Sequence, residues 1–155
     1  MTVSFDAFRP DAIALLTRST GIDFSGCNFA DADTWLCVTG RDDEGAVAGL
    51  AAFEFKSRYD AHFSTVIRDR RCLTRRVLRA MFQAVFSRAS RVTALVEPHN
   101  AGAIRQARRM GFQEEGFMRR AIEGRRDALL FGMLAEDCRY LPREVIDHGF
   151  HAQAA

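Results

Sequence analysis

The sequence contains little lysine, little proline and no long hydrophobic run. Its 155 residues include one lysine, Lys56, against 21 arginines, and three prolines. No apolar stretch approaches the roughly 20 residues that a membrane-spanning helix needs. The first residues, MTVSFDAFRPD, lack the basic start and apolar stretch of a signal peptide. We therefore expect a cytoplasmic protein with no membrane partner.

Motifs for metals and nucleotides are also missing. The four cysteines are irregularly spaced, with no C-x-x-C pair and no histidine at zinc-ligand spacing: Cys27, Cys37, Cys72 and Cys138. We expect reduced, mostly buried thiols and no metal. Neither the Walker pattern nor G-x-G-x-x-G occurs, which counts against a P-loop and a Rossmann dinucleotide site.

The composition is that of one soluble globular domain. Hydrophobic residues make up 48% and charged residues 27%, with a net charge of +2. A chain of this length buries enough surface to need no disulfide or metal. No repeat or Pro/Gly/Ser-rich linker interrupts it, so we expect one domain over 1–141 and a tail over 142–155.

The hydrophobic periodicity predicts a mixed α/β fold, in the order strand, helix, three strands, helix, strand, helix and two strands. The predicted helices cover 11–18, 73–86 and 101–110, and the assigned strands cover 34–39, 47–55, 61–67, 92–96, 112–122 and 127–134. Asn100 is a good N-cap for the last helix, and Gly111 is placed to end it. The strands 61–67 and 92–96 flank a helix, so they should be parallel neighbours.

Arginines gather where the second predicted helix begins. The stretch Arg68–Arg79 reads RDRRCLTRRVLR and holds six arginines. Cations at a helix N-terminus oppose the helix dipole, and a bound anion would compensate for this. We therefore infer a phosphate or pyrophosphate site at Arg68–Arg76. The alternative is a solvated helix face in an arginine-rich protein.

Several residues of the C-terminal half share their spacing with a known family. They are Asn100, Gly111 and Phe112 eleven residues on, Glu115 and Gly116, Arg119, Asp127, and the stretch FGML at 131–134. In this spacing, residues 73–141 resemble the GNAT acetyltransferases, most closely the ribosomal-protein-alanine (Rim-type) branch and short stand-alone members of phages and proteobacteria. The resemblance implies a mixed, mostly antiparallel sheet with a central parallel pair and helices on both faces.

The resemblance also implies an acetyl-CoA site between the strands that end at Ile67 and Val96, without a metal. In the family these strands splay apart, the pantetheine arm pairs with their exposed backbone, and the pyrophosphate lies on the helix N-terminus. The residues implied to bind the cofactor are Val66, Ile67, Arg68, Cys72, Leu73, Thr74, Arg75, Arg76 and Asn100. The family's pyrophosphate motif, Gln/Arg-x-x-Gly-x-Gly/Ala, here has Cys72 and Thr74 at its small positions.

The implied reaction is transfer of acetyl from acetyl-CoA to a primary amine, by direct attack through a tetrahedral intermediate. Many members carry a tyrosine acid four residues before the Gly-Phe pair, where this sequence has Ala107. A base must deprotonate the amine. Of the candidates His62, Glu97 and Glu54, we favour Glu97 or His62, although each also fits a purely structural role.

Two other functions stay open. A GNAT-shaped binding or assembly module without catalysis fits the side chains at Cys72, Thr74 and Ala107. Nucleic-acid binding through the arginines is the weakest hypothesis, because the net charge is only +2 and acidic residues are interleaved. The sequence does not choose among a protein N-terminus, a lysine and a small amine as acceptor, and a homodimer through the C-terminal strands or helices is a further hypothesis.

Overall fold

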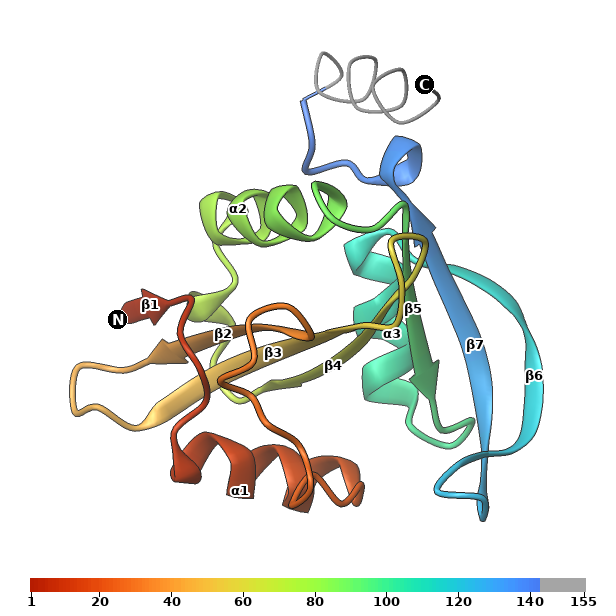
Figure 1. Ribbon diagram of the computed structural model, residues 1–155, viewed down its shortest axis with the longest axis horizontal. Coiled ribbons are helices and arrows are strands. Elements are labelled where there is room, and N and C mark those ends of the chain that lie inside the picture. Colours follow the sequence, from red (N-terminus) through yellow and green to blue (C-terminus); the bar gives the residue numbers. More distant parts are fainter. Residues whose placement is uncertain (143–155) are drawn as a thin grey trace.

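A seven-stranded sheet runs through the protein, with the strand order β1-β2-β3-β4-β5-β7-β6 (Figure 1). The computed structural model describes residues 1–142. The strands are β1 (Thr2–Ser4), β2 (Trp35–Arg41), β3 (Val47–Phe55), β4 (Ala61–Ile67), β5 (Arg91–Val96), β6 (Gln113–Ile122) and β7 (Arg126–Leu134). Within this described part, only β4 and β5 pair in parallel, and all other neighbouring strands are antiparallel. This confirms the predicted sheet and its central parallel pair.

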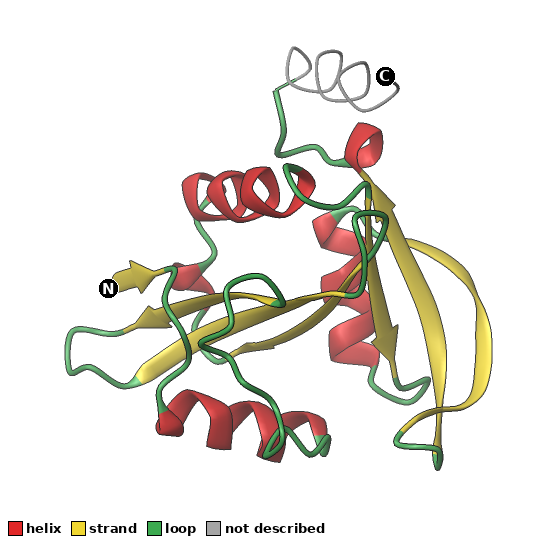
Figure 2. Ribbon diagram, viewed as in Figure 1, coloured by secondary structure: helices red, strands yellow, loops and turns green. Residues whose placement is uncertain are grey.

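Helices cover both faces of the sheet, as predicted (Figure 2). They are α1 (Pro10–Thr20), α2 (Arg75–Phe86) and α3 (Ala101–Met110). Side chains of α2 and α3 form one core with Phe53 and Phe131, while α1 packs a second core around Phe29 and Trp35. Alternate residues of the central strands point into the two cores, which explains why these strands are apolar along most of their length.

Most predicted elements lie within two residues of their observed positions. The strands β3 and β4 and the helix α3 have the predicted bounds. The side chain of Asn100 accepts a hydrogen bond from the backbone N–H of Ala103 at 3.0 Å, and Gly111 has a φ of 105°, so both expected caps are present. Within residues 1–142, the helices are too short or too polar to cross a membrane.

The start of the second helix was predicted wrongly. The helix α2 begins at Arg75, not at Leu73, because Thr74 is its N-cap and accepts a hydrogen bond from the backbone N–H of Val77. A short 3-10 helix, Arg70–Cys72, precedes it and was not predicted. Leu73 misled the prediction because it packs against the core from the turn outside the helix. The predicted tail, 142–155, lies outside the described residues except for Pro142.

Candidate functional site

The parallel strands β4 and β5 part shortly after they meet. They pair only at Ala61 with Val92 and at His62 with Thr93. On their outer sides, β4 stays paired with β3 as far as Ile67, and β5 stays paired with β7 as far as Val96. Beyond His62, the inner edges of both strands therefore face each other without pairing. These edges carry backbone N–H and C=O groups that a ligand can bind.

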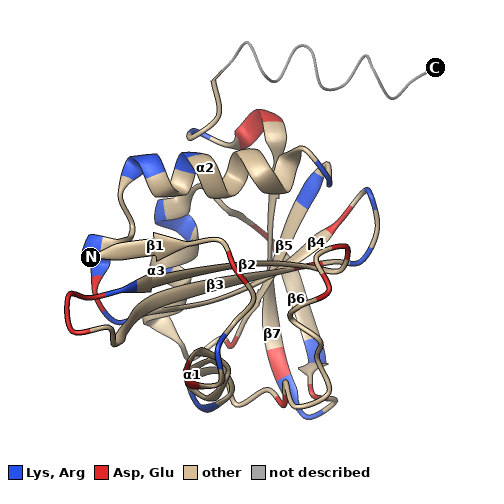
Figure 3. Cartoon of the chain, turned by 60° about the vertical axis from the view of Figure 1, so that its left-hand side comes forward, with Lys and Arg blue, Asp and Glu red and all other residues tan. Residues whose placement is uncertain are grey.

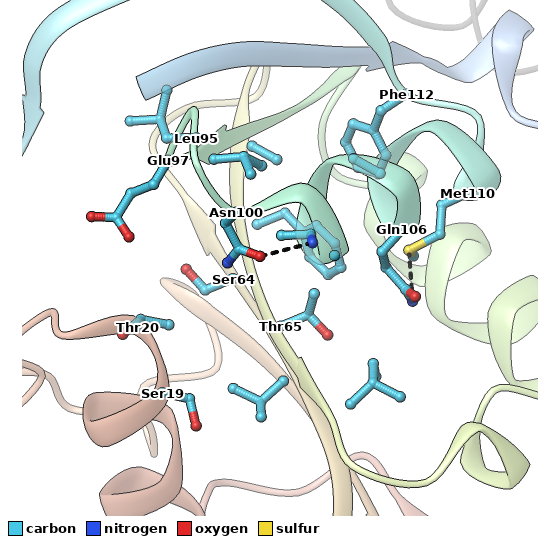
Figure 4. A pocket seen from close by; sticks show the side chains of 18 of the residues that line it. Ser19, Thr20, Ser64, Thr65, Leu95, Glu97, Asn100, Gln106, Met110 and Phe112 are labelled. Atoms are coloured by element: carbon cyan, nitrogen blue, oxygen red, sulfur yellow. Dashed lines mark hydrogen bonds between the residues drawn. The ribbon is translucent and has the colours of Figure 1, made fainter. Parts of the chain in front are cut away.

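A cavity of about 340 Å³ occupies the gap between these two strands. Its walls are Phe63–Ile67 of β4 and Ala94–Glu97 at the end of β5. The helix α3 borders it from one face of the sheet, and the end of α1, with Ser19 and Thr20, borders it from the other. The cavity therefore lies within the sheet itself, between the two helical layers (Figure 4).

The polar groups are distributed unevenly along the cavity. Figure 4 shows Glu97 and Ser64 on the side where Ser19 and Thr20 lie, with Gln106, Met110 and Phe112 on the opposite side. The side-chain oxygen of Asn100 accepts the capping hydrogen bond of α3, so its side-chain N–H groups can donate to other partners. The sequence prediction did not include Ser19, Thr20, Ser64 or Gln106, because isolated polar residues in helices and strands give no signal of a site.

Glu97 lines the cavity, but its carboxylate is not free. Its Oε1 accepts a hydrogen bond from Nη1 of Arg126 at 2.7 Å, and its Oε2 lies 3.7 Å from Nε2 of His99. Nη1 of Arg126 also donates to the backbone oxygen of Thr20, at 2.9 Å, which ties β7 to the end of α1. Among the described residues, Nη2 of Arg126 is buried without a hydrogen-bond partner. Arg126 was not among the predicted site residues, since nothing in its neighbourhood in the sequence distinguishes it from the other arginines.

The structure does not place His62 in the cavity lining. Its Nε2 lies 3.3 Å from Oδ2 of Asp60, and the hydroxyl of Thr93 donates to Oδ1 of Asp60 at 2.7 Å. His62 pairs with Thr93, four residues before Glu97, so the two candidate bases are separated by roughly 13 Å along the strand direction. They are therefore alternatives and cannot act on the same atom.

The expected phosphate-binding residues lie beside the cavity rather than in it. Val66 and Ile67 line the cavity, and the arginine-rich turn follows directly after them. Among residues 1–142, Arg68, Arg70, Arg75 and Arg76 form no ion pair, and all four are exposed. Arg71 is paired with Asp69 at 2.6 Å, and this contact holds the pKa of the Asp69 carboxyl below its usual range. Figure 3 shows the basic positions along α2 in blue.

The turn between β4 and α2 is closed toward the sheet and open toward solvent. Cys72 is 4% exposed and points inward, where it packs beside Gly40 and Gly49. With Leu73, it lines only a small hollow of about 20 Å³. The backbone N–H groups of Cys72 and Leu73 donate within the turn, to the carbonyls of Asp69 and Arg70. The side chain at this expected glycine position therefore leaves the outer surface of the turn clear.

The backbone N–H groups at the start of α2 can still donate hydrogen bonds to an anion. The hydroxyl of Thr74 already caps the helix by accepting from Val77, so the N–H groups of Arg75 and Arg76 are the next ones available. Together with the unpaired strand edges, they fit a long ligand that has amides at one end and phosphates at the other. The described residues contain no group of three His, Cys, Asp or Glu side chains arranged to hold a metal ion.

The protein is similar to known proteins in its fold and not in its sequence. No protein-family model and no curated protein matches the sequence. A ribosomal-protein-S18-alanine N-acetyltransferase from Escherichia coli superposes with a TM-score of 0.63 at 20% identity, over 86% of this chain and 94% of that one. A mutant spermidine N-acetyltransferase from Vibrio cholerae gives 0.66 at 17% identity, over 93% and 99%. The chain has the GNAT acetyltransferase fold.

A third solved structure extends the likeness to a second ribosomal-protein acetyltransferase. The ribosomal-protein-S5-alanine acetyltransferase from Vibrio fischeri has a TM-score of 0.62 at 16% identity, over 88% of this chain and 94% of that one. The GNAT fold confirms the resemblance found in the C-terminal half and extends it to the N-terminal third. In this GNAT fold Ala107 lines the cavity, so the position where many members carry a tyrosine faces the site here without an acid.

Proposed function

We propose that the protein is an N-acetyltransferase that moves an acetyl group from acetyl-CoA to a primary amine. The observation that carries the proposal is the parting of β4 and β5 after His62 and Thr93, which leaves two unpaired strand edges around a cavity. This cavity of about 340 Å³ ends beside Arg68, which forms no ion pair among the described residues.

The residues present fit acetyl-CoA along its length. The amides of the pantetheine arm would bind the backbone of Val66 and Ile67 and the side-chain amide of Asn100. The diphosphate would bind the N–H groups of Arg75 and Arg76, with their guanidinium groups as bidentate donors. Arg68, Cys72, Leu73 and Thr74 shape this turn, and Thr74 acts through its helix cap. The thioester supplies the acyl group and a thiolate that leaves readily.

The acetyl transfer needs a neutral amine and donors for the oxyanion. We propose direct attack by the amine through a tetrahedral intermediate, with the oxyanion accepting from backbone N–H groups on the inner edge of β5. Glu97 is the better placed base because it lines the cavity. His62, held by Asp60, would have to act through water.

Calorimetry with CoA tests the proposal most directly. We expect binding by the full-length protein and release of CoA when acetyl-CoA is supplied with a panel of primary amines. Absence of CoA binding at millimolar ligand would overturn the proposal. Binding without transfer to any amine would favour instead a GNAT-shaped binding module without catalysis. The absence of an acidic side chain at Ala107 supports this alternative.

For the acceptor, we propose the chemical class and not the individual molecule. The similar solved structures include acetyltransferases for alanine of ribosomal proteins and for spermidine. We propose that this chain also acts on an amine acceptor. We further propose that it works in the cytoplasm, without a membrane partner. A homodimer through the C-terminal strands or helices remains a hypothesis.

A further inference from the structure

We infer that the acceptor is a monoamine with no second positive charge near the reacting nitrogen, and that polyamines are excluded. This inference rests on the proposed function. It follows from the charges of the cavity lining between β4 and β5, where the described residues offer no unpaired carboxylate to a second ammonium group.

Among residues 1–142, the cavity lining contains one carboxylate, that of Glu97. The other lining residues of this part of the chain have apolar, amide or hydroxyl side chains or are glycine. Glu97 is already paired with Arg126 at 2.7 Å and has His99 at 3.7 Å. The pair is part-buried, with 20% of the glutamate side chain and 30% of the arginine side chain exposed. An incoming cation at Glu97 would therefore meet a charge that is already neutralised.

The neighbouring strands repeat this pattern on the face that α1 covers. Across that face, Glu54, His62 and Thr93 stand side by side in register. Three carboxylates of these strands and their turns have a basic partner: Glu54 pairs with Lys56, Asp60 contacts His62, and Glu115 pairs with Arg91. The hydrogen bonds from Arg91 keep the pKa of Glu115 below its usual range, so that carboxylate stays ionised and paired.

The part of the cavity next to the point where β4 and β5 diverge is its least charged part. The strands diverge after His62 and Thr93, and the first lining residues beyond this point are Phe63, Ser64, Ala94 and Leu95. A single amine carries no charge in this region once the base has removed its proton, and the neutral amine is the form that attacks. A second ammonium group would be desolvated among these side chains with no partner charge, which is strongly unfavourable.

Spermidine and a neutral peptide test the inference. Calorimetry on the CoA-loaded wild-type protein should show no spermidine binding at millimolar concentration. The amidated tetrapeptide Ala-Gly-Ser-Gly, which carries one amine, should be acetylated with at least about tenfold higher kcat/KM than spermidine. Spermidine binding, or acetylation of spermidine in preference to the peptide, would overturn the inference. Failure of CoA itself to bind would instead overturn the proposed function.

A matched pair of variants tests the charge argument itself. Ser64→Asp places an unpaired carboxylate in the lining, and Ser64→Asn has nearly the same shape without the charge. We expect CoA-loaded Ser64→Asp to bind spermidine about tenfold or more tightly than CoA-loaded Ser64→Asn. Equal spermidine binding by the two folded variants, checked by circular dichroism, would show that the charge of the lining does not select the acceptor.

Discussion

The thiol of Cys72 occupies the space beside Gly49 that a side chain at position 49 would need. A methyl group built on Gly49 would lie 2.6 Å from Sγ of Cys72, and one built on Gly40 would lie 2.6 Å from its Cβ. The turn before α2 is thus anchored to strands β2 and β3 through one buried side chain. The side chain that stands at the small position of the resembled motif is a packing contact here.

This contact predicts a specific pattern of rescue. Gly49→Ala and Gly40→Ala should each lower the free energy of unfolding by about 1–3 kcal/mol, because each overpacks the contact. Adding Cys72→Ala removes Sγ but keeps Cβ, so it should partly rescue Gly49→Ala and leave Gly40→Ala unrescued. Urea denaturation of the single and double variants measures both effects. Equal rescue of the two glycine variants would contradict the assigned contact.

The arginines at the start of α2 should carry much of the CoA affinity. Arg75→Ala combined with Arg76→Ala should weaken CoA binding by about 1.5–3 kcal/mol for each charge-assisted hydrogen bond that the substitutions remove. Isothermal titration calorimetry measures the change, and raising the salt concentration should reduce it. The matched control is Arg9→Ala with Arg18→Ala, two exposed arginines at the ends of α1. Equal affinity of both double variants would place the phosphates elsewhere.

Asn100 should have two separable roles. Asn100→Ala should cost about 1 kcal/mol of stability because the cap of α3 is lost, whereas Asn100→Asp keeps a capping oxygen and should preserve the stability. Both variants lack the side-chain N–H groups, so both should bind CoA more weakly. Thermal unfolding and calorimetry measure the two effects independently. Wild-type CoA affinity in Asn100→Asp would show that the amide makes no hydrogen bond to the ligand.

The two candidate bases should differ in their kinetic effect. Glu97→Gln should lower kcat by about 10²-fold to 10⁴-fold, in the range typical of a missing general base, with the CoA affinity little changed. The loss should shrink at high pH, where the acceptor amine is neutral in solution. His62→Gln, outside the cavity lining, should have the smaller effect. A pH–rate profile that responds to His62→Gln and not to Glu97→Gln would reverse the assignment.

The cysteines should react very unequally with a thiol reagent. Burial raises the pKa of the Cys37 thiol to about 11, and it also raises the pKa values of Cys72 and Cys138. At pH 8 the Cys37 thiol is therefore almost entirely protonated. Burial raises the pKa of the Cys27 thiol as well, but Cys27 is part-exposed and the other three cysteines are buried. In the native protein Cys27 should react first, and all four should react in denaturant. The free energy of unfolding should fall as pH rises from about 9 toward 11. In this range the Cys37 thiol ionises in the unfolded chain but stays mostly protonated in the folded protein.

Local patterns in the sequence predicted the elements but not the site between them. Asn100 and Gly111 marked both ends of α3 because capping depends on residues within one turn. Leu73 misplaced the start of α2, since a buried turn residue has the same apolar signal as a helical one. The parallel pairing of β4 with β5 followed from the helix between them. How far the pairing extends depends on packing across the sheet, which no local pattern encodes.

The side chains around the cavity show the same limit. Val66, Ile67, Asn100 and Glu97 were predicted and do line it. The partner of Glu97, Arg126, lies 29 residues away and was missed, because long-range ion pairs leave no trace in spacing. The inward direction of Cys72 could not be predicted either. It depends on Gly40 and Gly49, which lie on two other strands and leave room for the thiol.

The hydrogen bond from Arg126 to the carbonyl of Thr20 joins residues 106 positions apart in the chain. A ribosome makes α1 before β7, so this hydrogen bond can form only after the start of β7 has been synthesised. Until then β5 also lacks its antiparallel neighbour, because β7 is inserted between β5 and β6. A nascent chain truncated before position 126 should therefore lack the hydrogen bond that holds the end of α1, and one edge of β5 should remain unpaired.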